Sequence, residues 1–316
     1  LIAARNEKNV ILKMNTGSGK TVVGLIMLQS CLNEEKGPAI YVVPDNYLVK
    51  QVVDEAKRLG ISVTEDRDDY NYSNSKAILV TSIQTVVNGY SYFGMRESGN
   101  YPIGSIIIDD VHACMDKIMC QFMIKIDAET DAYKELIALF SSSLKDYNPK
   151  SYIDIVEMKD CRKNMLVPYW EWQRQQDNIY RILKKYNNSD NKEICFGLPL
   201  IERGLETCDC IITASAIEIS PKGIDLEKIS SLEEASRRIY MSATLADDSV
   251  FVSALGLAKE DMKNIITPEN ANDIGDRLII FPKYVNGDIS EFDIREKVEK
   301  ISEIYNVVIL VPSFSR

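Results

Sequence analysis

The stretch Asn9-Val-Ile-Leu-Lys-Met-Asn-Thr-Gly-Ser-Gly-Lys-Thr-Val-Val-Gly24 decides the fold of this 316-residue chain. It starts with an apolar strand at 10–12, passes through a glycine-rich loop and runs directly into a helical pattern of apolar residues. A strand, a glycine loop and a helix in this order are typical of a phosphate-binding loop. The plainer alternative is a Gly/Ser turn before an ordinary helix, but Lys20 and Thr21 follow the glycines in register.

Each residue of this loop has a chemical task. Glycines let the backbone pass close to a phosphate, so that successive N–H groups and the helix N-terminus point at the anion. Lys20 adds a positive charge for the β and γ oxygens, and the Thr21 hydroxyl is suited to ligate Mg²⁺. Met14 stands where the strict pattern has glycine. The predicted nucleotide-binding residues are Thr16, Gly17, Ser18, Gly19, Lys20 and Thr21.

Composition limits the class of protein. The length predicts about two domains, and 45% hydrophobic with 27% charged residues is ordinary for a globular chain. No apolar run reaches the roughly 18–20 residues that cross a bilayer, so we expect a cytoplasmic protein without a membrane partner. A net charge of −10 argues against general coating of polyanions. The 7 cysteines are an odd number without a C-x-x-C pair, which favours reduced buried thiols over metal ligation.

Apolar runs predict the domain layout. Runs at 39–43, 77–80 and 105–108 alternate with helical patterns, which indicates an α/β fold with a parallel sheet covered on both faces. In such sheets ligands lie at the carboxyl ends of the strands. We expect a first domain from 1–114 and 208–262, with strands again at 210–213 and 238–242. Residues 115–207 show amphipathic stripes and predict an inserted helical lobe. Residues 270–316 predict the opening β-α-β of a second, truncated domain.

An acidic pair, Asp109 and Asp110, follows the buried strand at 105–108. Beside a phosphate loop, such a pair suits Mg²⁺ coordination by Asp109 and positioning of the attacking water by Asp110. An Asp pair at a strand end is otherwise a loop or helix cap. His112 is the only histidine, which excludes a histidine-based metal cage and a Ser/His triad.

Three motifs together resemble motifs I, II and III of superfamily 2 DEAD/DEAH-type helicases: Thr16–Thr21, Asp109–His112 and Ser242–Thr244. The resemblance implies RecA-like domains that bind ATP and Mg²⁺ between them. It also implies that His112, Ser242, Ala243 and Thr244 couple ATP hydrolysis to movement. Pro44, Leu48 and Gln51 match that group's motif Ia, and Thr81-Ser82 stands where its next nucleic-acid motif is expected. The implied nucleic-acid contacts are Pro44, Asn46, Gln51, Thr81 and Ser82.

The layout is similar to the xeroderma-pigmentosum-D and damage-inducible-G branch of these helicases. That branch carries its arch domain between motifs II and III, where this chain has the predicted lobe. It often holds an iron–sulfur cluster through four cysteines between motifs Ia and II. This chain has no cysteine between Gln51 and Asp109, so no cluster is predicted. Asp110 also replaces the family's Glu, which shortens the side chain by one methylene.

The stretch 159–186 within the predicted lobe is basic and aromatic. It has seven Lys or Arg against three acids, a surplus of four positive charges, interleaved with Trp170 and Trp172. Cations and stacking rings suit a single-stranded nucleic acid, with Trp170 as the candidate contact. The alternative is an amphipathic helix whose Trp172 and Ile179 are core and whose lysines are solvated.

These patterns predict an ATP-dependent helicase or translocase that acts on single-stranded or partly duplex nucleic acid, with DNA favoured. An alternative from another class is a nucleotide-gated interaction module in a larger defence or repair complex, suggested by Asp110 and the acidic charge. An RNA helicase is a further alternative, since motifs I to III do not distinguish RNA from DNA.

Overall fold

The computed structural model describes residues 4–15, 17–95, 101–224, 226, 229–243, 255, 257, 260–261, 265–268, 278–285 and 287–309. The chain divides into two compact units, Leu1–Ala271 and Asn272–Arg316. Each unit is described by itself.

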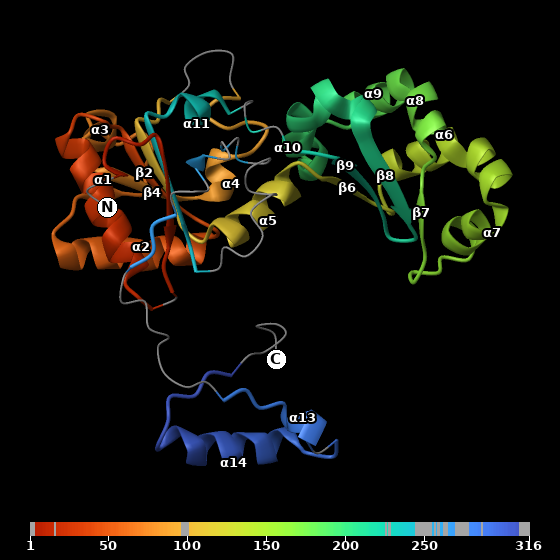
Figure 1. The fold of residues 1–316 in the computed structure, drawn as a ribbon. Coiled ribbons are helices and arrows are strands. Elements are labelled where there is room, and N and C mark those ends of the chain that lie inside the picture. Colours follow the sequence, from red (N-terminus) through yellow and green to blue (C-terminus); the bar gives the residue numbers. More distant parts are fainter. Residues whose placement is uncertain are drawn as a thin grey trace. The chain divides into compact units, whose positions relative to one another are not determined.

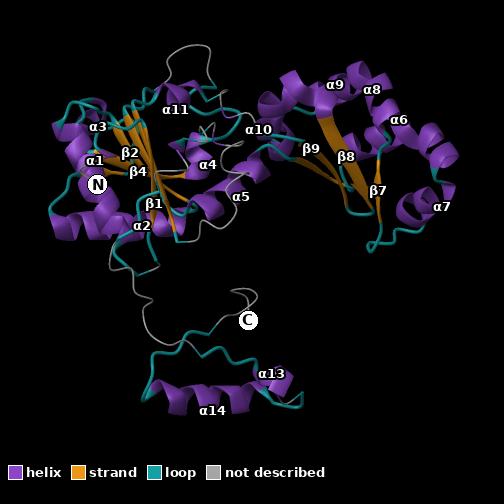
Figure 2. Ribbon diagram, in the orientation of Figure 1, coloured by secondary structure: helices purple, strands orange, loops and turns teal. Residues whose placement is uncertain are grey.

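A six-stranded parallel sheet forms the centre of the first unit (Figures 1 and 2). Its strand order is β1-β10-β5-β2-β4-β3, and every neighbouring pair is parallel. The α/β fold expected from the sequence is therefore confirmed. The strands are β1 (Asn9–Lys13), β2 (Ala39–Val43), β3 (Val63–Thr64), β4 (Ile78–Ser82), β5 (Ser105–Ile108) and β10 (Arg237–Ser242).

Both faces of this sheet are covered, which explains the continuous apolar runs. In β2 all five residues are buried, and alternate side chains enter two separate hydrophobic clusters. One cluster packs under α1 and α2, and the other under α4 and α5. Burial on both faces is the usual state of parallel strands. The helices of this part are α1 (Lys20–Asn33), α2 (Asn46–Leu59), α3 (Tyr70–Ser73), α4 (Ile83–Val86), α5 (Val111–Gln121) and α11 (Ser230–Glu234).

A second sheet lies in the segment inserted between β5 and β10. It has four antiparallel strands in the order β6-β9-β8-β7. The expectation that the parallel sheet resumes at 210–213 is therefore wrong, because these residues belong to β8. Burial in β8 alternates along the strand, as expected when an antiparallel sheet packs on one face. The strands are β6 (Ile124–Asp127), β7 (Asn164–Leu166), β8 (Cys208–Thr213) and β9 (Ala216–Pro221).

Helices surround this second sheet, so the inserted lobe is mixed rather than purely helical as expected. Its hydrophobic core is continuous with the cluster on one face of the parallel sheet. Trp172, 1% exposed, stacks on Phe140 and donates its indole N–H to the Leu205 carbonyl oxygen at 2.9 Å. The helices are α6 (Asp131–Tyr147), α7 (Pro149–Tyr152), a π-helical turn η2 (Ile153–Glu157), α8 (Tyr169–Arg174), α9 (Gln176–Lys185), α10 (Lys192–Ile201) and a 3₁₀ segment η3 (Glu202–Thr207).

The second unit contains α13 (Pro282–Val285) and α14 (Glu291–Ser302). Ser290 and Asp293 form a capping box at the start of α14. The strands expected at 276–281 and 306–311 are not formed in the described residues 278–281 and 306–309. Residues 278–281 expose their apolar side chains, and parallel strands form where both sheet faces are covered.

No helix in the described part of the chain combines the length and the apolar character that a membrane span requires.

Candidate nucleotide site

The loop between β1 and α1 has the backbone conformation of a phosphate cradle. Gly17 and Gly19 have positive φ angles of 81° and 80°, in the left-handed region that glycine adopts without strain. Gly19 is the N-cap of α1, so Lys20 and Thr21 open the helix where its N–H groups are free of intrahelical acceptors. Ser18 is exposed, and its hydroxyl donates to the Asn15 carbonyl oxygen at 2.6 Å. Thr16 lies outside the described residues.

Asp109 follows β5, and its side chain bonds to the tyrosine of β2. The Tyr41 hydroxyl donates to Asp109 Oδ2 at 2.8 Å. The strand register explains the meeting: Val42 pairs with Ile108, and the Asp109 N–H donates to the Val42 carbonyl oxygen at 2.9 Å. The Thr21 side chain lies near the same hydroxyl, where it acts against the rise of the Tyr41 pKa. Thr21 and Asp109, the two predicted magnesium ligands, therefore lie in one neighbourhood.

Burial controls the electrostatics of this cluster. Removal from water raises the pKa of Asp109, while the Tyr41 hydrogen bond and the positive charge of Lys20 act in the opposite direction. Burial, followed by the charge of Asp109, raises the pKa of Tyr41 well above its usual range. The charge of Lys20 acts on Asp109, so the lysine and the acidic pair lie in one neighbourhood. Their joint role at a nucleotide stays a prediction.

Asp110 caps α5 in an unusual conformation. Its φ and ψ angles are 48° and 65°, in the left-handed region that non-glycine residues adopt infrequently. Its backbone N–H donates to Asp109 Oδ1 at 2.9 Å, and the residue is exposed. Strained backbone of this kind clusters at functional sites. Asp110 is therefore the solvent-exposed member of the acidic pair, next to the partly buried Asp109.

His112 and Ser242 are brought together, although 130 positions separate them in the sequence. His112 Nδ1 lies 2.9 Å from Ser242 Oγ, across from α5 to the end of β10. The Ser242 carbonyl oxygen also accepts from the Met14 N–H at 2.9 Å, so β10 touches the beginning of the phosphate loop. Ala243 follows directly, and Thr244 lies outside the described residues.

The donor set fits a magnesium–nucleotide complex. Mg²⁺ takes oxygen ligands and is bound through one or two protein side chains plus substrate phosphates. Thr21 and Asp109 offer a hydroxyl and a carboxylate, and Lys20 with the glycine loop is suited to the phosphates. The described residues contain no group of three or more His, Cys, Asp or Glu side chains that could hold a metal ion. The expected lack of an iron–sulfur cluster stays a prediction.

Several predicted nucleic-acid contacts lie along the same edge of the parallel sheet. Pro44 follows β2 and Asn46 opens α2, while Thr81 and Ser82 end the neighbouring strand β4. The pairing of Val42 with Thr81 sets these strand ends side by side. Asn46 and Gln51 are exposed, whereas Thr81 and Ser82 are buried. The contact role of all five residues stays a prediction.

Trp170 and Trp172 on α8 have opposite environments. Trp170 is 60% exposed and meets Tyr147 edge-on at 5.4 Å between ring centroids, whereas Trp172 is core. The positive surplus of this stretch is mostly neutralised by ion pairs. Three of the acids involved, Glu135, Asp154 and Glu202, lie outside the stretch. The pairs are Arg162–Asp160, Lys163–Asp154, Arg174–Glu171, Lys184–Glu202 and Lys185–Glu135.

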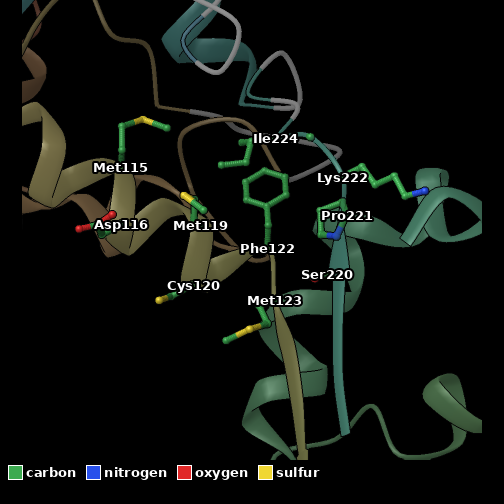
Figure 3. Close-up of a pocket in the computed structure, with 11 residues that line it drawn as sticks. Met115, Asp116, Met119, Cys120, Phe122, Met123, Ser220, Pro221, Lys222 and Ile224 are labelled. Atoms are coloured by element: carbon green, nitrogen blue, oxygen red, sulfur yellow. The ribbon is translucent and has the colours of Figure 1, made fainter. Parts of the chain in front are cut away.

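A hollow of about 680 Å³ lies where α5 and β9 join the lobe to the parallel sheet. Figure 3 shows the Phe122 ring between the end of α5 and the end of β9, with Ile224 next to it. None of Lys20, Thr21 and Asp109 lines this hollow. Its lining residues are Met115, Asp116, Met119, Cys120, Phe122, Met123, Ser220, Pro221, Lys222, Gly223 and Ile224.

Tyr41 is the site residue that sequence reasoning missed. The sequence pattern places Tyr41 among the apolar residues of its strand. The signal that could have identified it as a site residue is its position along that strand. Tyr41 is the only polar-tipped side chain in Ala39–Val43, two residues before the strand ends beside the acidic pair. A buried tyrosine hydroxyl needs a hydrogen-bond partner, and the carboxyl edge of the sheet supplies one.

Comparisons with known proteins give a family match for the first part of the chain. Residues 2–148, 147 of the 316, match the family described as "Type III restriction enzyme, res subunit". No curated protein matches the sequence at a significant level.

Two of the solved structures that match this chain carry the name XPD. "Structure of S. tokodaii Xpd4" has 14% identity and a TM-score of 0.47, over 85% of this chain and 58% of that chain. "XPD_APO" has 17% identity and a TM-score of 0.49, over 84% of this chain and 56% of that chain. This chain thus spans little more than half the length of these two proteins. The family match supports a relationship between residues 2–148 and superfamily 2 helicases.

Proposed function

We propose that this chain is the nucleotide-binding part of an ATP-dependent helicase or translocase that acts on nucleic acid. One observation carries the proposal: the Tyr41 hydroxyl bonds Asp109, at the end of β5, and lies near Thr21, at the start of α1, within reach of the charge of Lys20. This arrangement unites the phosphate loop and the acidic pair at one edge of the parallel sheet. The family match over residues 2–148 supports the same class.

The residues of the chain have distinct tasks in this proposal. Main-chain N–H groups of the glycine loop and the Lys20 ammonium bind the β and γ phosphates. The Thr21 hydroxyl and the Asp109 carboxylate hold Mg²⁺, which neutralises charge on the phosphate oxygens when bound. Asp110, exposed beside Asp109, orients the attacking water. Phosphoryl transfer depends mostly on positioning and charge, so these residues supply what hydrolysis requires.

Coupling to movement is proposed for the contact between α5 and β10. His112 lies on α5 two residues after Asp110, and its ring reaches Ser242 at the end of β10. A change at the acidic pair therefore acts directly on the strand end where Ala243 and Thr244 follow.

Nucleic acid is the proposed partner, with DNA favoured over RNA because of the resemblance to the xeroderma-pigmentosum-D branch. Pro44, Asn46, Gln51, Thr81 and Ser82 are the proposed contacts on the parallel-sheet domain. Trp170 is the proposed contact on the lobe. Since five cations of the lobe are paired with acids, stacking rather than charge is the contribution expected from this surface.

The decisive experiment measures ATP hydrolysis by this chain and by any longer form of the protein that contains it. Each is assayed alone, with single-stranded DNA, with single-stranded RNA and with a duplex bearing a single-stranded tail. Stimulation by a strand supports a motor, and the better strand identifies the substrate. Absence of ATP binding by the wild-type chain would overturn the proposal.

A second candidate is a nucleotide-gated interaction module of a larger complex. The observation that favours it is Asp110, which is one methylene shorter than the Glu of the resembled motif. Because a displacement of about 1 Å can cost roughly a hundredfold in rate, slow hydrolysis would suit a switch. ATP binding with slow turnover that no nucleic acid stimulates would support this candidate over the motor.

A further inference from the structure

We propose that Tyr41 is a positioning residue of the nucleotide site, which holds the Asp109 carboxylate in place beside Thr21 for a magnesium–nucleotide complex. The inference rests on the proposed function, because it assumes that Thr21 and Asp109 are the magnesium ligands. It adds a third residue, from a strand that carries none of the recognised motifs of this site.

The hydrogen bonds around Tyr41 have a defined direction. A tyrosine hydroxyl has a single proton, and here that proton goes to Asp109 Oδ2 at 2.8 Å. Asp109 Oδ1 accepts from the Asp110 N–H at 2.9 Å, so both oxygens of the carboxylate are oriented. An ionised carboxylate has about four acceptor positions, which leaves positions for a cation after both bonds are made.

The Tyr41 ring is held by packing, in addition to the hydrogen bond of its hydroxyl. The side chain is 0% exposed, and it lies directly under α1. A Cβ added at Gly24 would meet Tyr41 Cε2 at 2.8 Å, with Met241 and Ile107 side-chain atoms at 3.0 and 3.3 Å. Glycine at position 24 is thus what lets α1 approach the ring, and the ring in turn has no space for another orientation.

A purely structural role would leave a buried hydroxyl bonded to the backbone or without a partner. Two other buried tyrosines show these two cases. Tyr133 donates to the Thr213 carbonyl oxygen at 2.9 Å, and the Tyr72 hydroxyl has no hydrogen-bond partner among the described residues. Tyr41 instead bonds the carboxylate of a predicted magnesium ligand. Groups that orient a metal ligand affect metal affinity by about 10–100-fold.

The test compares Tyr41→Phe with Tyr72→Phe. Both variants remove one hydroxyl from a buried ring, but only the first removes a hydrogen bond to Asp109. Binding of a fluorescent ADP analogue is measured while Mg²⁺ is titrated, and again in excess EDTA. For Tyr41→Phe we expect the Mg²⁺ concentration at half-saturation to rise about 10–100-fold, with binding in EDTA changed less than about twofold. Tyr72→Phe should match the wild type in both measurements.

Different failures have different meanings. If the wild-type chain binds the analogue without any effect of Mg²⁺, the proposed function itself is wrong. If the wild type responds to Mg²⁺ and Tyr41→Phe responds identically, only the role of Tyr41 is overturned. An equal loss with Mg²⁺ and in EDTA would show a packing defect and also overturn it.

A measurement on the wild type covers the case in which Tyr41→Phe does not fold. A crystal structure with Mg²⁺ and ADP should keep the Tyr41 hydroxyl within hydrogen-bond distance of Asp109. A phenol that has left the carboxylate in that structure would overturn the inference.

Discussion

The two sheets of the first unit use their polar residues in opposite ways. The parallel sheet is apolar along its strands and gathers polar side chains at its carboxyl edge, where Tyr41 bonds Asp109 close to Thr21. The antiparallel sheet alternates buried residues with exposed or partly exposed ones in β6 and β8. Its lobe satisfies charges locally, as in the pairs Lys184–Glu202 and Lys185–Glu135. Chemistry is therefore expected at the parallel sheet, and packing or surface contacts at the lobe.

The largest effect is expected from Lys20→Ala, which removes the positive charge at the start of α1. ATP turnover should fall to background, because the charge on the γ-phosphate loses its main side-chain partner. Melting temperature should stay close to that of the wild type, since the residue is partly exposed. If the turnover of Lys20→Ala stayed within tenfold of the wild type, the carboxyl edge of the parallel sheet would not be the site of ATP hydrolysis.

Trp172→Ala should give the largest loss of stability in the lobe. The residue is 1% exposed, stacks on Phe140 and bonds Leu205, and truncation of a buried Trp costs about 3–5 kcal/mol. Urea denaturation followed by circular dichroism measures this loss. Nucleotide binding by the remaining folded protein should be retained, because none of the residues at the nucleotide site touches this ring. A stability change below about 1 kcal/mol would contradict the assignment of Trp172 to the core.

Asp110→Ala should separate binding from hydrolysis at the parallel-sheet edge. Fluorescent ATP analogues should bind as to the wild type, while turnover falls about a hundredfold, which corresponds to about 2.7 kcal/mol in the barrier. Asp110→Gly is the matched control, since glycine adopts the φ of 48° without strain and also lacks the carboxylate. Equal turnover by wild type and Asp110→Ala would exclude Asp110 from the mechanism.

The smallest effect is expected from Trp170→Ala, on the same helix as Trp172. Loss of one stacking ring should weaken single-stranded DNA binding by about 1–3 kcal/mol in a gel-shift titration. Melting temperature should not change, because the side chain is 60% exposed. Unchanged DNA binding would limit nucleic-acid contacts to the parallel-sheet domain, and a clear drop in melting temperature would point to packing against Tyr147 instead.

Sequence patterns predicted the parallel sheet better than the lobe for a physical reason. Strands buried on both faces, such as Ala39–Val43, have unbroken apolar sequences. The glycine loop after β1 predicts the helix α1 that follows it. In the short strands of the lobe, apolar and polar residues alternate, as in Ile124–Asp127. Two apolar and two polar residues are too few to distinguish such a strand from one face of an amphipathic helix. The run at 208–213 was assigned to the wrong sheet because pairing partners are not encoded in a strand's own composition.

The candidate site was predicted only as far as single motifs allow. Lys20, Thr21 and Asp109 were found because their residue types and spacing indicate phosphate and metal chemistry. Tyr41 was not, because a lone tyrosine in a strand is normally core, and its bond to Asp109 depends on the register of β2 against β5. Similarly, the basic character of 159–186 was overestimated, since its partners Glu135, Asp154 and Glu202 lie outside that stretch.

The helix α5 connects the candidate nucleotide site to the inserted lobe. It starts at Asp110, where its cap is strained, and its far end enters the lobe through Phe122. The lobe has a second attachment, where the Gly89 N–H donates to the Phe196 carbonyl oxygen at 3.0 Å, so close that a Cβ on Gly89 would lie 2.2 Å from that oxygen. This helix of 11 residues is about 16 Å long, so a tilt of about 10° at its capped end would displace the other end by roughly 3 Å. A rearrangement of the acidic pair that tilted α5 would therefore move the lobe at its attachment near Phe122, while the Gly89–Phe196 contact would hold the lobe at its other attachment.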